Sequence, residues 1–261
     1  LDPDRRTPSG IKAAIIREKG TNGEREMAYM LYLAGFDVKD VTMTDLVSGR
    51  ETLEDINMVV YCGGFSNSDV LGSAKGWAGS FLFNPKAKAA LDKFYAREDT
   101  LSLGVCNGCQ LMMELGLITP EDKKKGKMLH NDSHKFESAF LGVTVPMNRS
   151  VMFGSLSGSK LGIWVAHGEG KFSLPYPEDH YNVVLKYSYD EYPGNPNGSD
   201  YSVAGIASQD GRHLAMMPHL ERACFPWENA YYPLDRKDND QITPWMEAFV
   251  NARKWVEAHK K

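Results

Sequence analysis

The most informative segment of the sequence has a cysteine between two glycines. It lies in Gly104-Val105-Cys106-Asn107-Gly108, and an apolar run of strand length, 101–105, leads into it. A strand that passes through Gly-x-Cys-x-Gly into a helix is typical of a nucleophile elbow, with cysteine in place of serine. The N-terminus of the following helix favours the thiolate form of a cysteine. The pattern predicts that Cys106 is a catalytic nucleophile and that the backbone N–H of Asn107 points at the same place.

Other interpretations of this segment stay open at this point. Cys106 and Cys109 form a C-x-x-C pair at the start of a helix, which is a spacing that redox proteins use. A small buried cysteine in a glycine-rich turn is the simplest alternative, since free cysteine is commonly buried. Zinc is less consistent with the sequence, because Cys62 and Cys224 stand alone and no histidine pair has ligand spacing. The nucleophile is favoured because it explains both flanking glycines.

A cysteine nucleophile needs a base, and His219 is the best candidate among the seven histidines. It follows a strand-like run, and in extended chain Glu221 would lie on the same side and orient the imidazole. His167 also begins a His-x-Glu sequence; it is the rival base, and we interpret it as a wall of the site. The other histidines have polar surroundings and are expected at the surface: His130, His134, His180, His213 and His259.

A pair of glycines follows another strand-like run, 58–62. Gly63 and Gly64 would expose backbone N–H groups at the same sheet edge as Cys106, where α/β proteins build their sites. Gly64 is the expected second donor to an oxyanion. A plain turn is the alternative. A phosphate-binding loop is less consistent, because no Lys-Ser/Thr pair follows.

The elements that must position these residues follow from the spacing of apolar residues. Strand-like runs alternate with amphipathic stretches up to about residue 138, which predicts an α/β fold with a doubly wound, mostly parallel sheet and helices on both faces. Beyond that point, runs joined by turns predict extra antiparallel strands. The predicted strands are 13–16, 38–43, 58–62, 101–105, 141–145, 162–166, 183–187, 204–208 and 214–217. The predicted helices are 24–34, 85–97, one that begins just after Cys106, and 244–259.

Composition places the chain among ordinary globular proteins. Of its 261 residues 42% are hydrophobic and 25% charged, and the formal net charge is −4. That charge predicts neither a nucleic-acid partner nor an anionic membrane surface, and no apolar run approaches the ~18 residues of a membrane span. Four cysteines suit a reducing compartment such as the cytoplasm. Residues 1–10, polar and punctuated by Pro and Gly, are interpreted as a linker from an upstream domain, and residues 11–261 as one domain.

Taken together, these motifs resemble the class I glutamine amidotransferase fold, which is flavodoxin-like. The resemblance rests on Gly104 to Met112 and on Met216 to Arg222. Over about Ile11 to Trp255, the chain is similar to the glutaminase domains of the phosphoribosylformylglycinamidine synthase family. Further segments match in the family's order: Gly63–Ser66, Asp69–Gly72, Gly76–Ala78, Asn131–Ser133, Phe136–Glu137 and Ala166–Gly170. The chain departs from the family at Leu220, where proline is usual, and at Asn67-Ser68, where Tyr-Gly is common.

The resemblance implies a reaction and a role for each residue. Cys106 would attack the side-chain amide of glutamine to form a γ-glutamyl thioester, with His219 as base and Glu221 as its orienter. Gly64 and Asn107 would donate N–H groups to the oxyanion. Five further residues are expected at the substrate: Phe65, Gln110, Ser133, Phe136 and His167.

The resemblance also implies a partner. The ammonia would pass to a synthetase domain of the same polypeptide, which uses ATP and Mg²⁺ to amidate formylglycinamide ribonucleotide in purine biosynthesis. The glutaminase domain itself is expected to need no metal or cofactor. The alternatives are a C-x-x-C redox protein, a cysteine hydrolase of the dienelactone type, and a degenerate domain that only binds its partner.

Overall fold

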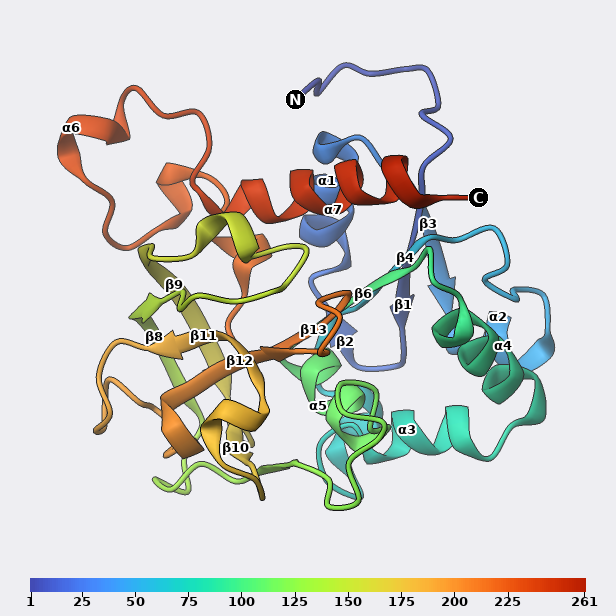
Figure 1. Cartoon of the computed structure of the whole chain (residues 1–261), viewed down its shortest axis with the longest axis horizontal. Coiled ribbons are helices and arrows are strands. Elements are labelled where there is room, and N and C mark those ends of the chain that lie inside the picture. Colours follow the sequence, from blue (N-terminus) through green and yellow to red (C-terminus); the bar gives the residue numbers. More distant parts are fainter.

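A nine-stranded mixed sheet forms the centre of the molecule, with the strand order β3-β1-β4-β6-β13-β12-β11-β8-β9. It is seen in a computed structural model that describes residues 1–261 (Figure 1). Five strands run parallel: β3 (Asp37–Thr42), β1 (Lys12–Arg17), β4 (Met58–Tyr61), β6 (Leu101–Val105) and β13 (His213–Met216). The antiparallel extension contains β12 (Val203–Ala207), β11 (Asn182–Tyr187), β8 (Glu137–Thr144) and β9 (Lys160–His167). The parallel half has the order of a flavodoxin-like sheet, which confirms the predicted fold class.

Helices cover both faces of the parallel half. On one face α1 (Glu24–Ala34) contacts α7 (Trp245–His259). On the other face four helices contact one another in series: α2 (Met43–Ser48), α4 (Pro85–Ala96), α3 (Lys75–Leu82) and α5 (Asn107–Glu114) (Figure 1). The shorter elements are α6 (Leu234–Lys237), β2 (Thr21–Asn22), β5 (Gly63–Gly64), β7 (Lys127–Leu129) and β10 (Lys171–Ser173). None of the helices has both the length and the apolar character that crossing a membrane requires.

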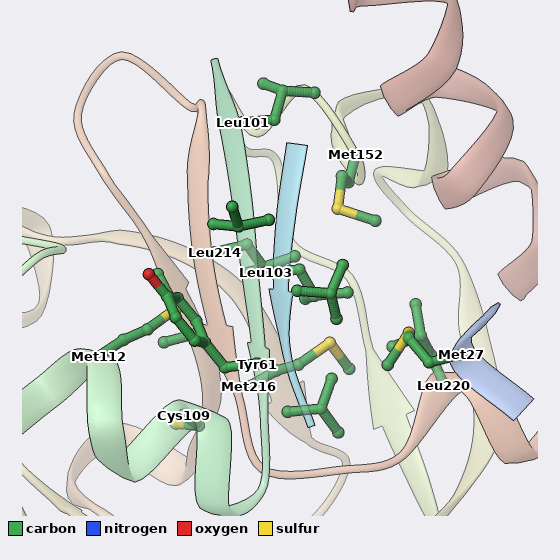
Figure 2. Close-up of a cluster of buried hydrophobic side chains, with 14 of the residues drawn as sticks. Met27, Tyr61, Leu101, Leu103, Cys109, Met112, Met152, Leu214, Met216 and Leu220 are labelled. Carbon is green, nitrogen blue, oxygen red and sulfur yellow. The ribbon is translucent and has the colours of Figure 1, made fainter. Parts of the chain in front are cut away.

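The central strands are buried on both faces. Every residue of β4 and of β6 is buried, as expected of parallel strands with helices on either side. Figure 2 shows Cys109 and Met112 of α5 beside Tyr61 on one side of these strands, and Met27 beside Leu220 on the other. Continuous apolar runs, rather than alternating ones, therefore mark the strands that carry the site.

Several elements differ from the prediction, and for two of them the reason can be identified. Strand β3 ends one residue before the predicted end, because Thr42 caps α2: its hydroxyl accepts a hydrogen bond from the N–H of Asp45, whose carboxylate accepts one from the N–H of Thr42. Helix α3 was not predicted. It contains two glycines, which lower helix propensity, and burial of Trp77 and Phe81 stabilises it.

Strand β13 joins the two halves of the sheet. A turn at 209–212 connects it to its antiparallel neighbour β12, while its other edge pairs in parallel with β6. In that register Met216 lies opposite Val105, so the two strands end side by side. The segments that follow them, including Cys106 and His219, must leave the sheet at the same edge.

Residues 1–10 contain neither helix nor strand. The guanidinium of Arg5 bonds to the carboxylate of Asp37 at 2.9 Å and to the carbonyl of Phe36 at 2.6 Å, so this segment contacts the edge of the sheet. Its assignment as a linker from an upstream domain stays a prediction.

Candidate active site

Cys106 lies at a sharp turn between β6 and α5. Its φ of 55° and ψ of −108° are unusual for a residue with a side chain and mark a strained backbone of the kind found at active sites. The flanking glycines are required by close packing. A Cβ atom on Gly104 would lie 2.4 Å from the carbonyl oxygen of Gly108, and one on Gly108 would lie 2.0 Å from that of Tyr61. The turn therefore has the geometry of a nucleophile elbow.

The parallel pairing of β13 with β6 brings His219 to this cysteine. The N–H of Cys106 donates to the carbonyl of Met216 at 2.9 Å, and the N–H of His219 donates to the carbonyl of Trp164 at 2.9 Å. Gly63 lies against both side chains, because a Cβ atom there would be 2.9 Å from Cε1 of His219 and 3.3 Å from Cβ of Cys106. A larger residue at position 63 would separate the two.

Glu221 holds the imidazole of His219. Oε1 of the carboxylate lies 2.6 Å from Nδ1, and both side chains are buried. They meet across a short 3₁₀ turn, η5 (Leu220–Arg222), and not along the extended chain that the sequence suggested. Burial by itself lowers the pKa of His219, but the charge of Glu221 and the hydrogen bonds to Cys106 and Glu221 outweigh it and raise the pKa to about 10. The raised pKa keeps the imidazole beside Cys106 protonated at neutral pH.

The rival histidine has a different environment. Burial, and then the positive charge of His219, lowers the pKa of His167 to about 3. The side-chain amide of Asn197 donates to Nδ1 of His167 at 2.9 Å. The nearby carboxylate of Glu169 instead accepts a hydrogen bond from the N–H of Ser73. His167 is therefore a neutral, fixed side chain without an acidic partner.

Cys106 opens into a cavity of about 170 Å³. Its wall contains six residues that the sequence singled out: Gly64, Phe65, Cys106, Gln110, Phe136 and His167. The remaining wall residues are Asp69, Ser73, His130, Ala166, Gly168 and Glu169. A larger surface cavity, about 460 Å³ and lined in part by Asn148 and Lys186, contains no cysteine or histidine. The smaller cavity is the candidate active site because its wall contains the predicted nucleophile, Cys106.

Asn107 lies behind this wall. As the first residue of α5 it has a backbone N–H without a partner inside the helix. Its fully buried side chain accepts a hydrogen bond from the N–H of Ser66 at 3.0 Å and donates one to Oε1 of Gln110 at 2.9 Å. The amide of Gln110 then donates to the carbonyl of Glu169 at 2.9 Å. One chain of hydrogen bonds thus connects three segments of the wall.

The structure places the two expected substrate-contact residues of the loop that precedes β8 in different surroundings. Phe136 is half-exposed in the wall and packs against Phe65, with their ring centroids 6.0 Å apart. Ser133 does not line the cavity; its hydroxyl accepts a hydrogen bond from the N–H of Lys135 at 3.3 Å. Ser133 supports the loop that presents Phe136.

The sequence analysis missed the acidic part of the wall, Asp69 and Glu169. Both residues could have been predicted from the sequence. Asp69 and Glu169 each lie in a segment that resembles the family and that follows a predicted strand. It also missed His130, whose Nε2 is 3.5 Å from Oε1 of Glu169. The carboxylates come from loops far apart in the sequence, so only the fold brings them together.

The surface position expected for His213 is wrong. This histidine is buried in β13, and its Nδ1 lies 2.7 Å from the hydroxyl of Ser102. Burial is the main cause that lowers its pKa to about 3. The residues before it in the sequence, Gly211 and Arg212, belong to the hairpin turn. Their position in a turn therefore does not predict the burial of residues in the strand that follows. The other four surface histidines are exposed as expected.

The second cysteine of the C-x-x-C pair points away from the cavity. Cys109 is fully buried against the sheet (Figure 2), and burial raises the pKa of its thiol. All four cysteines are free. The two sulfurs therefore lie in unlike surroundings, one at the cavity and one in the core.

Comparison with known proteins agrees with this geometry. A family model described as CobB/CobQ-like glutamine amidotransferase domain matches residues 10–256. The chain is 44% identical to the probable phosphoribosylformylglycinamidine synthase, chloroplastic/mitochondrial, of Arabidopsis thaliana, over 95% of this chain and 19% of the relative. It is also 44% identical to the human phosphoribosylformylglycinamidine synthase, over 96% of this chain and 21% of the relative. The chain thus spans about a fifth of the length of these curated relatives.

Solved structures have the same fold. A chain of the PurLQS structure from Thermotoga maritima matches with a TM-score of 0.69 and 26% identity, over 96% of this chain and 99% of that one. A glutamine amidotransferase from the same organism matches with a TM-score of 0.55 and 16% identity, over 95% of this chain and 99% of that one, which shows the fold alone. The elbow, the cavity and the family match lead to one conclusion: the chain belongs to the family of CobB/CobQ-like glutamine amidotransferase domains.

Proposed function

We propose that this chain is the glutaminase part of a phosphoribosylformylglycinamidine synthase, and that it hydrolyses glutamine through a thioester on Cys106. The observation that carries the proposal is the buried His219–Glu221 pair, with an Nδ1 to Oε1 distance of 2.6 Å, placed beside a cysteine on a nucleophile elbow. The 44% identity to synthases that carry this name supports the choice of reaction.

In the first half of the proposed reaction, glutamine loses its amide nitrogen. The Cys106 thiolate attacks the side-chain carbonyl carbon, a C–S bond forms, and negative charge moves to the oxygen. The N–H groups of Asn107 and Gly64 would stabilise that oxyanion, and one such donor contributes about 10²–10³ in rate at other acyl-transfer sites. The imidazolium of His219 gives its proton to the nitrogen, the C–N bond breaks, and ammonia leaves the γ-glutamyl thioester.

In the second half, water releases glutamate. Neutral His219 takes a proton from the water, whose oxygen attacks the thioester carbonyl. The C–S bond then breaks, glutamate leaves, and the thiolate and imidazolium are restored. Glu221 would orient the imidazole and stabilise the imidazolium in each half. Phe65, Gln110, Phe136 and His167 would shape the cavity around the substrate.

We also propose that the ammonia serves the ATP-dependent amidation of formylglycinamide ribonucleotide. A synthetase part of the same polypeptide would bind that nucleotide, ATP and Mg²⁺, and the five-fold greater length of the relatives supports this. The thioester chemistry needs no cofactor, because nucleophile and base are both side chains of this chain. Four free cysteines fit a reducing compartment such as the cytoplasm.

Apolar side chains near the cavity mouth are the surface that the synthetase part would cover. Phe65 and Phe136 lie in the wall and are 47% and 52% exposed, and Val70 and Leu71, next to Asp69, are 79% and 73% exposed. Docking there would close the cavity and allow acceptor binding to raise glutamine turnover. We therefore expect this chain alone to hydrolyse glutamine slowly. Full activity of the isolated chain, unchanged by the remaining polypeptide and its nucleotides, would contradict this coupling.

The experiment that tests the function compares two nitrogen donors in the whole polypeptide. Cys106→Ala and His219→Ala should abolish synthesis of formylglycinamidine ribonucleotide from glutamine but leave synthesis from free ammonia near the wild-type rate. Cys109→Ala, which removes the neighbouring thiol, is the matched control and should retain both activities. Glutamine-dependent synthesis by Cys106→Ala would contradict the proposal.

A further inference from the structure

A second cavity lies at the edge of the sheet opposite the active site. Its wall contains Tyr95 of α4, residues 117–121 after α5, the turn 208–212 and His213, the first residue of β13. Strands β6 and β13 begin at this edge and end at the edge that carries Cys106. The volume is about 380 Å³, which is within the range of small-molecule sites. No residue of this wall belongs to the active-site cavity.

His213 lies in this wall with one ring nitrogen unpartnered. The residue is 4% exposed, and its Nδ1 lies 2.7 Å from the hydroxyl of Ser102. The other nitrogen, Nε2, makes no hydrogen bond and is not among the unpartnered polar atoms that solvent cannot reach. It therefore faces the open space of the cavity. A polar atom in so apolar a place is unfavourable until a molecule in the cavity supplies a partner.

A chain of hydrogen bonds determines which nitrogen of His213 carries the proton. The hydroxyl of Tyr95 donates to that of Ser102 at 2.9 Å, and the hydroxyl of Tyr61 lies 3.2 Å from that of Tyr95. Because Ser102 accepts from Tyr95, its own proton goes to its other partner, Nδ1 of His213. The imidazole is neutral, since burial lowers its pKa to about 3. Nε2 therefore carries the ring proton and is a donor to the cavity.

The charges of the wall disfavour an anionic ligand. Its one cationic side chain, Arg212, has its Nε 2.8 Å from Oδ2 of Asp210. The same guanidinium donates to the carbonyl of Arg97 at 2.8 Å. Glu121 adds a second carboxylate to the wall. With no surplus of positive charge, the cavity is not suited to a phosphate or a carboxylate.

The surroundings of the donor are aromatic and aliphatic. The ring centroids of Tyr95 and His213 are 4.6 Å apart, and Leu117, Ile118 and Pro120 lie in the same wall. A sugar or a peptide would bring several polar groups against this apolar surface without partners. A heteroaromatic ring has an acceptor nitrogen within an otherwise apolar ring. That combination matches a single donor in an apolar wall.

We infer that this cavity binds a neutral bicyclic heteroaromatic molecule of the nucleobase class, through a hydrogen bond from Nε2 of His213 to one of its ring nitrogens. The inference does not depend on the proposed glutaminase function, because the two cavities share no residue. The ligand would lie at the far end of β6 from Cys106 and take no part in the thioester chemistry.

The test compares two probes that differ in one ring atom. Benzimidazole is neutral at neutral pH and has an acceptor nitrogen where indole has a C–H group; the two are otherwise alike in size, shape and N–H donor. In the whole polypeptide, saturation-transfer difference NMR gives the Kd of each probe. Wild type should bind benzimidazole at least about 10-fold more tightly than indole, because indole leaves Nε2 without a partner. Equal affinities, or no binding of benzimidazole, would overturn the inference.

His213→Phe removes the donor and keeps a ring at this position. Its affinity for benzimidazole should fall about 10-fold or more, to that for indole, while the affinity for indole changes by less than about threefold. A preference for benzimidazole that survives in His213→Phe would overturn the inference.

A second variant tests the site without changing His213, since His213→Phe also leaves the hydroxyl of Ser102 without an acceptor. Leu117 is half-buried in the cavity wall, and Leu117→Trp should fill the space and abolish binding of both probes. Leu82→Trp is the matched control, because Leu82 lies on α3 outside the cavity and is 44% exposed; it should bind both probes as wild type does. Benzimidazole binding that persists in Leu117→Trp would place the probe elsewhere, for example at a nucleotide site of the synthetase part, and would overturn the inference.

Discussion

Nδ1 of His219 and Oε1 of Glu221 lie 2.6 Å apart, in residues that are only 3% and 2% exposed. The other carboxylate oxygen, Oε2, is buried and has no hydrogen-bond partner. The imidazolium is thus the main compensation for the buried carboxylate of Glu221, and that carboxylate raises the pKa of His219. This relationship makes the pair sensitive to pH.

Glu221→Gln should destabilise the chain most at low pH. The pKa of His219 is raised to about 10, against about 6.5 when unfolded. Its stabilising contribution is therefore fully present below pH ~6.5 and is lost as the pH rises through about 10. We expect the variant to lose about 2–4 kcal/mol in free energy of unfolding at pH 6 and much less at pH 10, measured by urea denaturation.

The control for this experiment is Glu26→Gln, since Glu26 forms only a half-exposed pair with Arg222. It should give a small difference with no pH dependence in that window. A loss for Glu221→Gln that is equal at pH 6 and pH 10 would show that His219 is not the group that titrates.

An electrophilic analogue of glutamine should label Cys106 and leave Cys109 unmodified. The first sulfur lines the cavity, whereas the second is fully buried and burial raises its pKa. Peptide mapping by mass spectrometry gives the site, and Cys109→Ala should label as fast as wild type. Label on Cys109, or a stable Cys106–Cys109 disulfide under reducing conditions, would favour the redox alternative.

Gly108→Ala should destabilise the chain severely. Its Cβ atom would lie 2.0 Å from the carbonyl oxygen of Tyr61, a backbone atom of a central strand that cannot move away. We expect a loss of more than about 3 kcal/mol in thermal or urea unfolding. Gly79→Ala is the matched control: position 79 lies inside α3 with only ordinary contacts to Phe83, so it should gain about 0.5–1 kcal/mol. Equal stability of the two variants would contradict the close packing at the elbow.

Asn107→Ala should reduce both stability and activity, although it keeps the backbone N–H. The side chain bonds to Ser66 and Gln110 from a fully buried position, and leaving those groups without partners costs about 2–3 kcal/mol. We expect kcat/KM for glutamine to fall by about 10-fold or more, because the wall segments lose their alignment.

Asn84→Ala separates the two effects. Asn84 caps α4 through the N–H of Ala87 at 2.9 Å, away from the cavity, so this variant should lose about 1 kcal/mol and keep its kcat/KM. Wild-type kinetics in Asn107→Ala would show that the side chain has no part in aligning the site.

Most elements could be predicted because their determinants are local. Helix α1 has the predicted bounds, since apolar spacing defines its buried face and Gly35, with φ of 109°, ends it. Strand β6 also has its predicted bounds. Helix α3 could not be predicted, because its sequence has weak helix propensity and tertiary burial of Trp77 and Phe81 stabilises it.

Burial of polar residues was the least predictable property. The polar neighbours of His213 suggest exposure, yet the residue lies in a strand where Ser102 of the adjacent strand bonds to it. The spacing of His219 and Glu221 led to the observed pair although the chain there is a 3₁₀ turn and not extended. Whether a polar side chain is buried depends on which strands lie next to its own strand. The sequence of a single segment does not show which strands those are.

The sequence by itself determined the turn at Cys106, because only glycine fits at positions 104 and 108 when a strand enters a helix at that angle. The tertiary structure decided which histidine lies beside Cys106 as its candidate base. His219 and His167 both begin a His-x-Glu sequence, and only the parallel register of β13 on β6, with Met216 opposite Val105, places His219 beside the sulfur with its own carboxylate. Turn geometry is governed by sterics within a few residues, whereas register is governed by packing between residues distant in the chain.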